Sequence, residues 1–70
     1  MHYALFRGNS NKKEALGLFI SREAAWVTIN QTLKNEGIEP YYFRQWGDEV
    51  KEVTIDYGSH SDFFYIEVIK

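Results

Sequence analysis

The clearest structural pattern in this chain lies in residues 51–69, which read KEVTIDYGSHSDFFYIEVI. In residues 51–57 apolar side chains alternate with polar ones, and residues 62–69 carry two alternating sets of large side chains. Successive side chains of a β-strand point to opposite faces of a sheet, so this alternation predicts two strands. The Gly-Ser-His-Ser segment at 58–61 is rich in turn-forming residues. We therefore expect residues 51–69 to form an antiparallel pair of strands.

Three more strands are predicted upstream of this pair. Residues 3–7 and 14–20 are β-prone runs on either side of the turn-forming residues 8–11 (Gly-Asn-Ser-Asn), which is the pattern of a hairpin. Pro40 blocks the continuation of a helix and introduces an aromatic run at 41–46, which we expect to be the third strand.

One helix is predicted between the second and third strands, over residues 22–36. Ser21 is a good N-cap, Glu23 lies where a carboxylate favours the helix dipole, and Gly37 lies where a left-handed C-cap residue belongs. At about 100° per residue, one stripe of this helix is apolar and forms its core face. The stripe consists of Ala25, Trp26, Ile29 and Leu33.

These elements predict an α+β fold: a four- to five-stranded antiparallel sheet with one helix packed on one face, in the order β-β-α-β-β-β. The first strand is expected beside the last or the third, since either place keeps neighbouring strands antiparallel. One helix cannot cover both faces of such a sheet. We expect it to cover Leu16, Leu18, Ile20, Val53, Ile55, Phe64, Ile66 and Val68.

Length and composition restrict the kinds of protein that this chain can be. With 70 residues, 44% of them apolar, it is expected to fold as a single domain, residues 1–70. It contains no cysteine, which fits a cytoplasmic protein, and no apolar run is long enough to span a membrane. The net charge of -2 disfavours a general nucleic-acid binder, which normally carries a basic excess.

The face without a helix is predicted to be rich in aromatic side chains. Strand alternation places there Phe19, Tyr42, Trp46, Phe63 and Tyr65, together with Arg44, Thr54 and Asp56, and with Phe6 as a further candidate. Such a surface resembles the centre of a protein interface, where Trp, Tyr and Arg are enriched. Cross-strand pairing that stabilises a small sheet is the alternative explanation. A one-residue slip in the third strand would replace Tyr42 and Trp46 by Tyr41 and Phe43.

We therefore expect a small protein-interaction or regulatory module that binds a protein partner or itself, as a homodimer. Its predicted anchors are Tyr42, Arg44, Trp46, Phe63 and Tyr65. The alternative is a domain that stacks single-stranded nucleic acid on the sheet aromatics. Against it, no Lys/Arg-Gly-Phe run precedes the aromatics, and Asp56 would lie on the face that meets the phosphates.

Catalysis, metal binding and cofactor binding are not expected. Ser59, His60 and Asp62 place a hydroxyl, an imidazole and a carboxylate in one turn, and a hydrolase or metal site built on them is a third hypothesis. Catalytic residues are usually brought together from distant positions, whereas neighbours in a tight turn rarely aim at one another. The two histidines, His2 and His60, lack a metal-binding spacing, and the glycines form no phosphate-binding loop.

Overall fold

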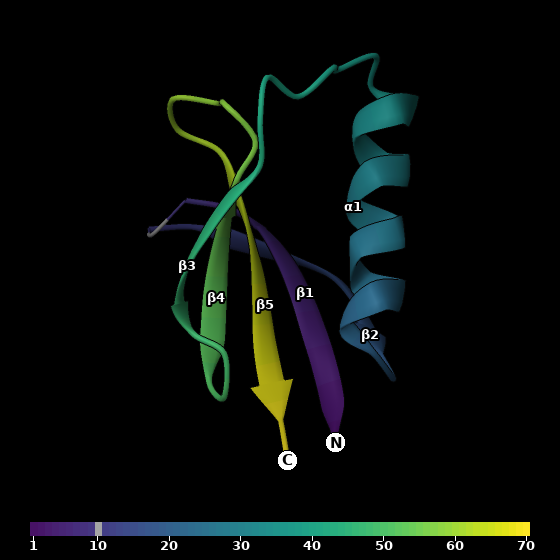
Figure 1. Ribbon diagram of the computed structural model, residues 1–70, viewed down its shortest axis with the longest axis vertical. Coiled ribbons are helices and arrows are strands. Elements are labelled where there is room, and N and C mark those ends of the chain that lie inside the picture. Colours follow the sequence, from purple (N-terminus) through teal and green to yellow (C-terminus); the bar gives the residue numbers. More distant parts are fainter. Residues whose placement is uncertain (10) are drawn as a thin grey trace.

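The computed structural model describes residues 1–9 and 11–70, in which one helix packs against a five-stranded antiparallel sheet (Figure 1). The elements are β1 (His2–Gly8), β2 (Lys13–Phe19), α1 (Arg22–Asn35), β3 (Arg44–Asp48), β4 (Glu52–Asp56) and β5 (Phe63–Ile69). The predicted α+β class and the order β-β-α-β-β-β are confirmed. Ser10, part of the predicted turn at 8–11, lies outside the described residues.

The strands lie in the order β2-β1-β5-β4-β3, so β1 is the neighbour of β5, one of the two places expected for it. All neighbouring strands are antiparallel, and β2 and β3 form the two edges of the sheet. Across the described ranges, no helix is long and apolar enough to cross a membrane.

The helix begins and ends with the capping residues that the sequence predicts. The Ser21 hydroxyl accepts a hydrogen bond from the backbone N–H of Ala24 at 3.1 Å. At the other end Gly37 adopts a φ of 70°, a left-handed conformation that glycine tolerates best. Its N–H donates to the Lys34 carbonyl, and the Ile38 N–H donates to the Leu33 carbonyl. These two bonds satisfy carbonyls that the last turn leaves open and reverse the chain toward β3.

The core lies between α1 and the sheet. Ala25, Ile29 and Leu33 of the helix are buried, as the apolar stripe predicts. The sheet contributes Leu5, Val53, Ile55, Phe64 and Ile66, and Tyr57, which directly follows β4, completes the buried set. Partly buried side chains pack around this set: Tyr3, Leu16, Phe19, Trp26 and Ile38. Figure 1 shows α1 beside the β1–β2 side of the sheet, away from β3.

The predicted facing of β2 is wrong beyond Leu16. Leu16 packs against the core as expected, but Leu18 is 60% exposed and Ile20 is exposed as well. Phe19, which was expected on the face without a helix, packs against the core instead.

A β-bulge causes this reversal. Leu5 pairs with Gly17, whereas its neighbour Phe6 pairs with Ala15, so Leu16 is an additional residue in β2. An additional residue shifts the alternation of every following side chain by one position. Phe19 therefore lies on the side of the helix, opposite Tyr3.

The third strand begins later than predicted, and its facing is as predicted. It covers Arg44–Asp48 instead of 41–46. Arg44 pairs with Asp56 and Trp46 with Thr54, which places both side chains on the helix-free face. Phe43 points the other way and meets the helix residue Trp26, with ring centroids 5.1 Å apart.

Candidate functional site

The five residues predicted to bind a partner form one connected series, here called the aromatic face. It consists of Tyr42, Arg44, Trp46, Phe63 and Tyr65. The Arg44 guanidinium lies 5.4 Å from the centroid of the Tyr42 ring and 5.9 Å from that of Trp46. Trp46 meets Phe63 edge-on at 6.0 Å, and Phe63 meets Tyr65 at 6.4 Å. Both ring distances are within the range of favourable aromatic pairs.

Tyr65 belongs to this face but is covered by its own chain. Its exposure is only 6%. It lies between Phe6 of β1 and Thr54 of β4, and the Lys13 ammonium lies 4.0 Å from the centroid of its ring. Lys13 also forms an ion pair with Glu52 at 3.3 Å. Lys13 is in β2 and Glu52 in β4, which are not neighbouring strands. The sheet must therefore curl toward its helix-free side, and this curl closes part of the face that was expected to lie open.

The accessible part of the aromatic face is Tyr42, Arg44 and Trp46, here called the edge stack. The two rings are each 47% exposed, and the Arg44 side chain is 68% exposed. Arg44 and Trp46 belong to β3, and Tyr42 lies just before it. Within the part of the chain that the structure describes, β3 pairs with β4 alone and forms one edge of the sheet (Figure 1). All five residues of β3 are exposed. Phe63, half-buried, supports the Trp46 ring from the side.

A buried carboxylate holds the edge stack in place. Asp56 accepts hydrogen bonds from the backbone N–H of Gly58 at 2.9 Å, from Arg44 at 3.2 Å and from the Tyr42 hydroxyl at 3.5 Å. The Gly58 N–H, followed by Arg44, lowers the pKa of the Asp56 carboxyl below its ordinary value. Asp56 is therefore ionised at neutral pH, and its hydrogen bonds hold the side chains of Arg44 and Tyr42 in position.

The rest of this face carries acidic side chains. Glu52 lies opposite Glu67 on one side and opposite Asp48 on the other, so three carboxylates occupy one row across β5, β4 and β3. One of them is paired with Lys13. Close to the edge stack the surface is therefore acidic, apart from Arg44.

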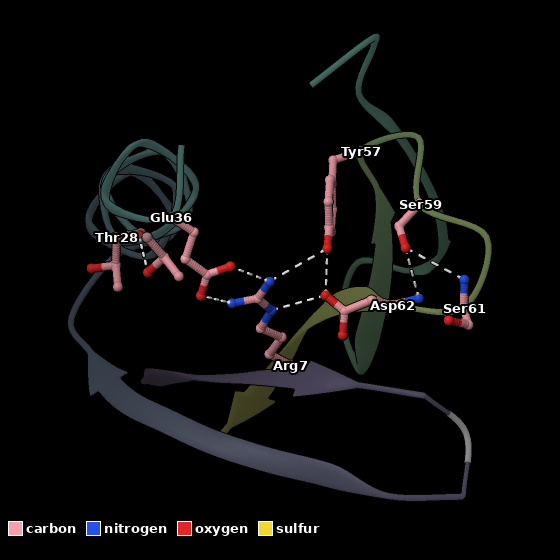
Figure 2. Close-up of polar contacts among 8 residues, drawn as sticks. Arg7, Thr28, Glu36, Tyr57, Ser59, Ser61 and Asp62 are labelled. Atoms are coloured by element: carbon pink, nitrogen blue, oxygen red, sulfur yellow. Dashed lines mark hydrogen bonds and ion pairs between the residues drawn. The ribbon is translucent and has the colours of Figure 1, made fainter. Parts of the chain in front are cut away.

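A second polar cluster lies at the helix side of the sheet, and it is shown in Figure 2. We call it the Arg7 cluster: Arg7, Glu36, Tyr57 and Asp62. Arg7 donates to Asp62 at 2.8 Å and to Glu36 at 2.7 Å, with a second bond to Glu36 and a long one of 3.5 Å to the Tyr57 hydroxyl. The Tyr57 hydroxyl itself donates to Asp62. The cluster thus joins β1, the end of α1 and the loop between β4 and β5.

The charges of the Arg7 cluster depend on one another. The bonds from Arg7 lower the pKa of the Glu36 carboxyl, and the two carboxylates raise the pKa of Arg7. Burial, followed by the bond to Asp62, raises the pKa of the Tyr57 hydroxyl. Glu36 is the C-cap of α1, where the helix dipole disfavours a negative charge. The positive charge of Arg7 offsets this unfavourable interaction, so the cluster stabilises the C-terminal end of α1.

Sequence reasoning missed this cluster, although one signal was present. Arg7 follows Tyr3 and Leu5 at strand spacing and therefore lies on the core face of β1. A charge at such a position requires a partner of opposite charge. Its partner Asp62 belongs to the turn considered for catalysis, but His60 is exposed and forms no bond to Asp62 among the described residues.

Comparisons with known protein families, with curated proteins and with solved structures gave no match to this chain.

Proposed function

We propose that this chain is a protein-interaction module and that the edge stack on β3 is its binding surface. One observation carries the proposal: Arg44 lies between two half-exposed rings and is fixed by the buried Asp56. Trp, Tyr and Arg are the residues that most often dominate the energy of protein interfaces. A stack that is already ordered loses little side-chain entropy on binding, which favours affinity.

An open strand edge beside the stack adds a second means of binding. A partner segment that pairs with β3 would gain main-chain hydrogen bonds, and its alternate side chains would meet the edge stack. The neighbouring carboxylates of Asp48, Glu52 and Glu67 disfavour the alternative, a platform for single-stranded nucleic acid. The cytoplasmic location and the lack of a catalytic role remain parts of this proposal.

The experiment is affinity capture by the immobilised full chain, followed by titration of each captured protein in purified form. The variants Trp46→Ala and Arg44→Ala are compared with Leu18→Ala, which removes an exposed side chain from the opposite edge of the same face. We expect Trp46→Ala to weaken binding about 30-fold or more, in the range of an interface hot spot. Leu18→Ala should bind like the wild type. Saturable binding that Trp46→Ala leaves unchanged would contradict the proposal, as would the lack of any saturable partner, including the chain itself.

A further inference from the structure

We propose that a second copy of this chain binds the β3 edge, and that the two β3 strands pair antiparallel with Trp46 opposite Trp46. The inference rests on the proposed function and names the partner of the same surface. It would join two sheets into one continuous sheet through an isologous contact, in which both copies use the same residues.

The order of side chains along β3 is complementary to itself. In an antiparallel pair centred on Trp46, Arg44 of one copy lies opposite Asp48 of the second copy, and the two-fold axis repeats this pair on the other side. Arg44, Trp46 and Asp48 alternate with Gln45 and Gly47, so all three project from the helix-free face. Two ion pairs would thus flank one aromatic pair, and both kinds of cross-strand pair are stabilising.

The groups that this pairing needs are available. Arg44 uses one terminal nitrogen for Asp56, and in residues 1–9 and 11–70 its other nitrogens have no hydrogen-bond partner. Asp48 accepts the Val50 N–H on one carboxylate oxygen at 3.0 Å, and no side chain of the described residues binds the other. The Asp56 bond holds Arg44 on the correct face, so the second copy meets an oriented guanidinium.

Other pairings of the exposed edges lack this complementarity. A register centred on Gln45 places Arg44 opposite Trp46 and leaves Asp48 without a basic partner. On the other edge, Lys13 and Glu14 of β2 are adjacent in sequence and so point to opposite faces. The Lys13 ammonium is also paired with Glu52 of its own chain.

The first measurement is the molar mass of the full chain by light scattering over a concentration series. We expect a monomer–dimer equilibrium whose dissociation constant rises with salt, because two exposed ion pairs contribute to it. Trp46→Ala should raise that constant about 30-fold or more. Asp48→Asn keeps an oxygen for the Val50 N–H and should raise it about five-fold through loss of the ion pairs. Leu18→Ala, at the other edge, should leave it unchanged.

The register is tested by disulfide trapping, because the chain contains no cysteine of its own. Arg44→Cys and Asp48→Cys are prepared separately and then mixed under mild oxidation. Directly opposed residues of an antiparallel pair have Cα atoms about 4.5–5.5 Å apart, within disulfide range. The mixture should form a 44–48 disulfide and retain one native ion pair. Neither variant should cross-link by itself, because in its homodimer the single cysteines of the two copies would be about 13 Å apart.

The outcomes separate this inference from the proposed function. A dimer with the mixed disulfide supports both. A dimer that does not form the 44–48 disulfide, or that Leu18→Ala weakens as much as Trp46→Ala does, overturns the inferred pairing. A monomer at every concentration that still binds another protein through Trp46 overturns the inference and keeps the proposed function. A monomer without any Trp46-dependent partner overturns both.

Discussion

Arg7→Met removes the cation of the Arg7 cluster and keeps a stem of similar length. Arg7 bonds to Asp62 at 2.8 Å and to Glu36 at 2.7 Å. A hydrogen bond to a charged group contributes about 1.5–3 kcal/mol. The Arg7–Asp62 pair is mostly buried and should contribute about 1.5–2 kcal/mol to the free energy of unfolding. The Arg7–Glu36 pair is more exposed, and screening by solvent lowers its contribution to about 0.5–1 kcal/mol. The substitution should therefore lower the free energy of unfolding by about 2–3 kcal/mol.

The assay is urea unfolding followed by circular dichroism, at a protein concentration that keeps the chain monomeric. With a slope of about 1 kcal/mol per molar urea, the midpoint should fall by about 2–3 M. The thermal midpoint should fall by about 10–20 °C. Arg22→Met is the matched control, because the carboxylate that Arg22 pairs with, Glu49, is 69% exposed and stays solvated when the cation is removed; it should cost less than about 1 kcal/mol. A loss below about 0.5 kcal/mol for Arg7→Met, or a loss equal to that of Arg22→Met, would show that the Arg7 cluster does not stabilise the end of the helix.

Three further predictions concern the cover of the aromatic face, the helix cap and the response to pH. Lys13→Met should make Tyr65 reactive toward nitration and cost less than about 1 kcal/mol; unchanged reactivity would show that Lys13 is not its cover. Ser21→Ala should cost about 1 kcal/mol in urea unfolding, whereas no loss would contradict the cap. Because folding lowers the pKa of Glu36, this carboxylate stabilises the fold at a pH above its pKa in the unfolded chain, about 4.3. This stabilisation is lost as the pH falls through the pKa of Glu36 in the folded chain. The raised pKa of Tyr57 adds stability below about pH 10 that is lost as the pH rises, so a flat profile at both extremes would contradict the cluster.

The sequence predicted best those elements whose two faces differ in chemistry. Residues 52–56 alternate between apolar and polar side chains, so only one register buries the apolar set. The helix was equally clear, because its cap residues and its apolar stripe agree. For β3, the alternation of residues 42, 44 and 46 predicted correctly that Trp46 lies on the helix-free face, although the strand begins later than expected.

The errors arose where the sequence carries no local signal. In β2, Leu16 and Leu18 flank a glycine, and both are large apolar residues, so the pattern does not reveal an additional residue in the strand. The burial of Tyr65 depends on the curl of the whole sheet, which brings Lys13 of one edge to Glu52 of a distant strand. Such a contact joins residues far apart in the chain and cannot be found from neighbouring residues alone.

The central claim is that the open edge of β3 binds protein, and the backbone of that edge tests it most directly. The measurement is amide hydrogen exchange of residues 44–48 at increasing concentrations of the purified full chain, with residues 13–19 of the other edge as the internal reference. We expect exchange in β3 to slow as the concentration rises, while exchange in β2 stays constant. The claim would be contradicted if two results came together: exchange in β3 does not change with concentration, and no partner that binds through Trp46 slows it.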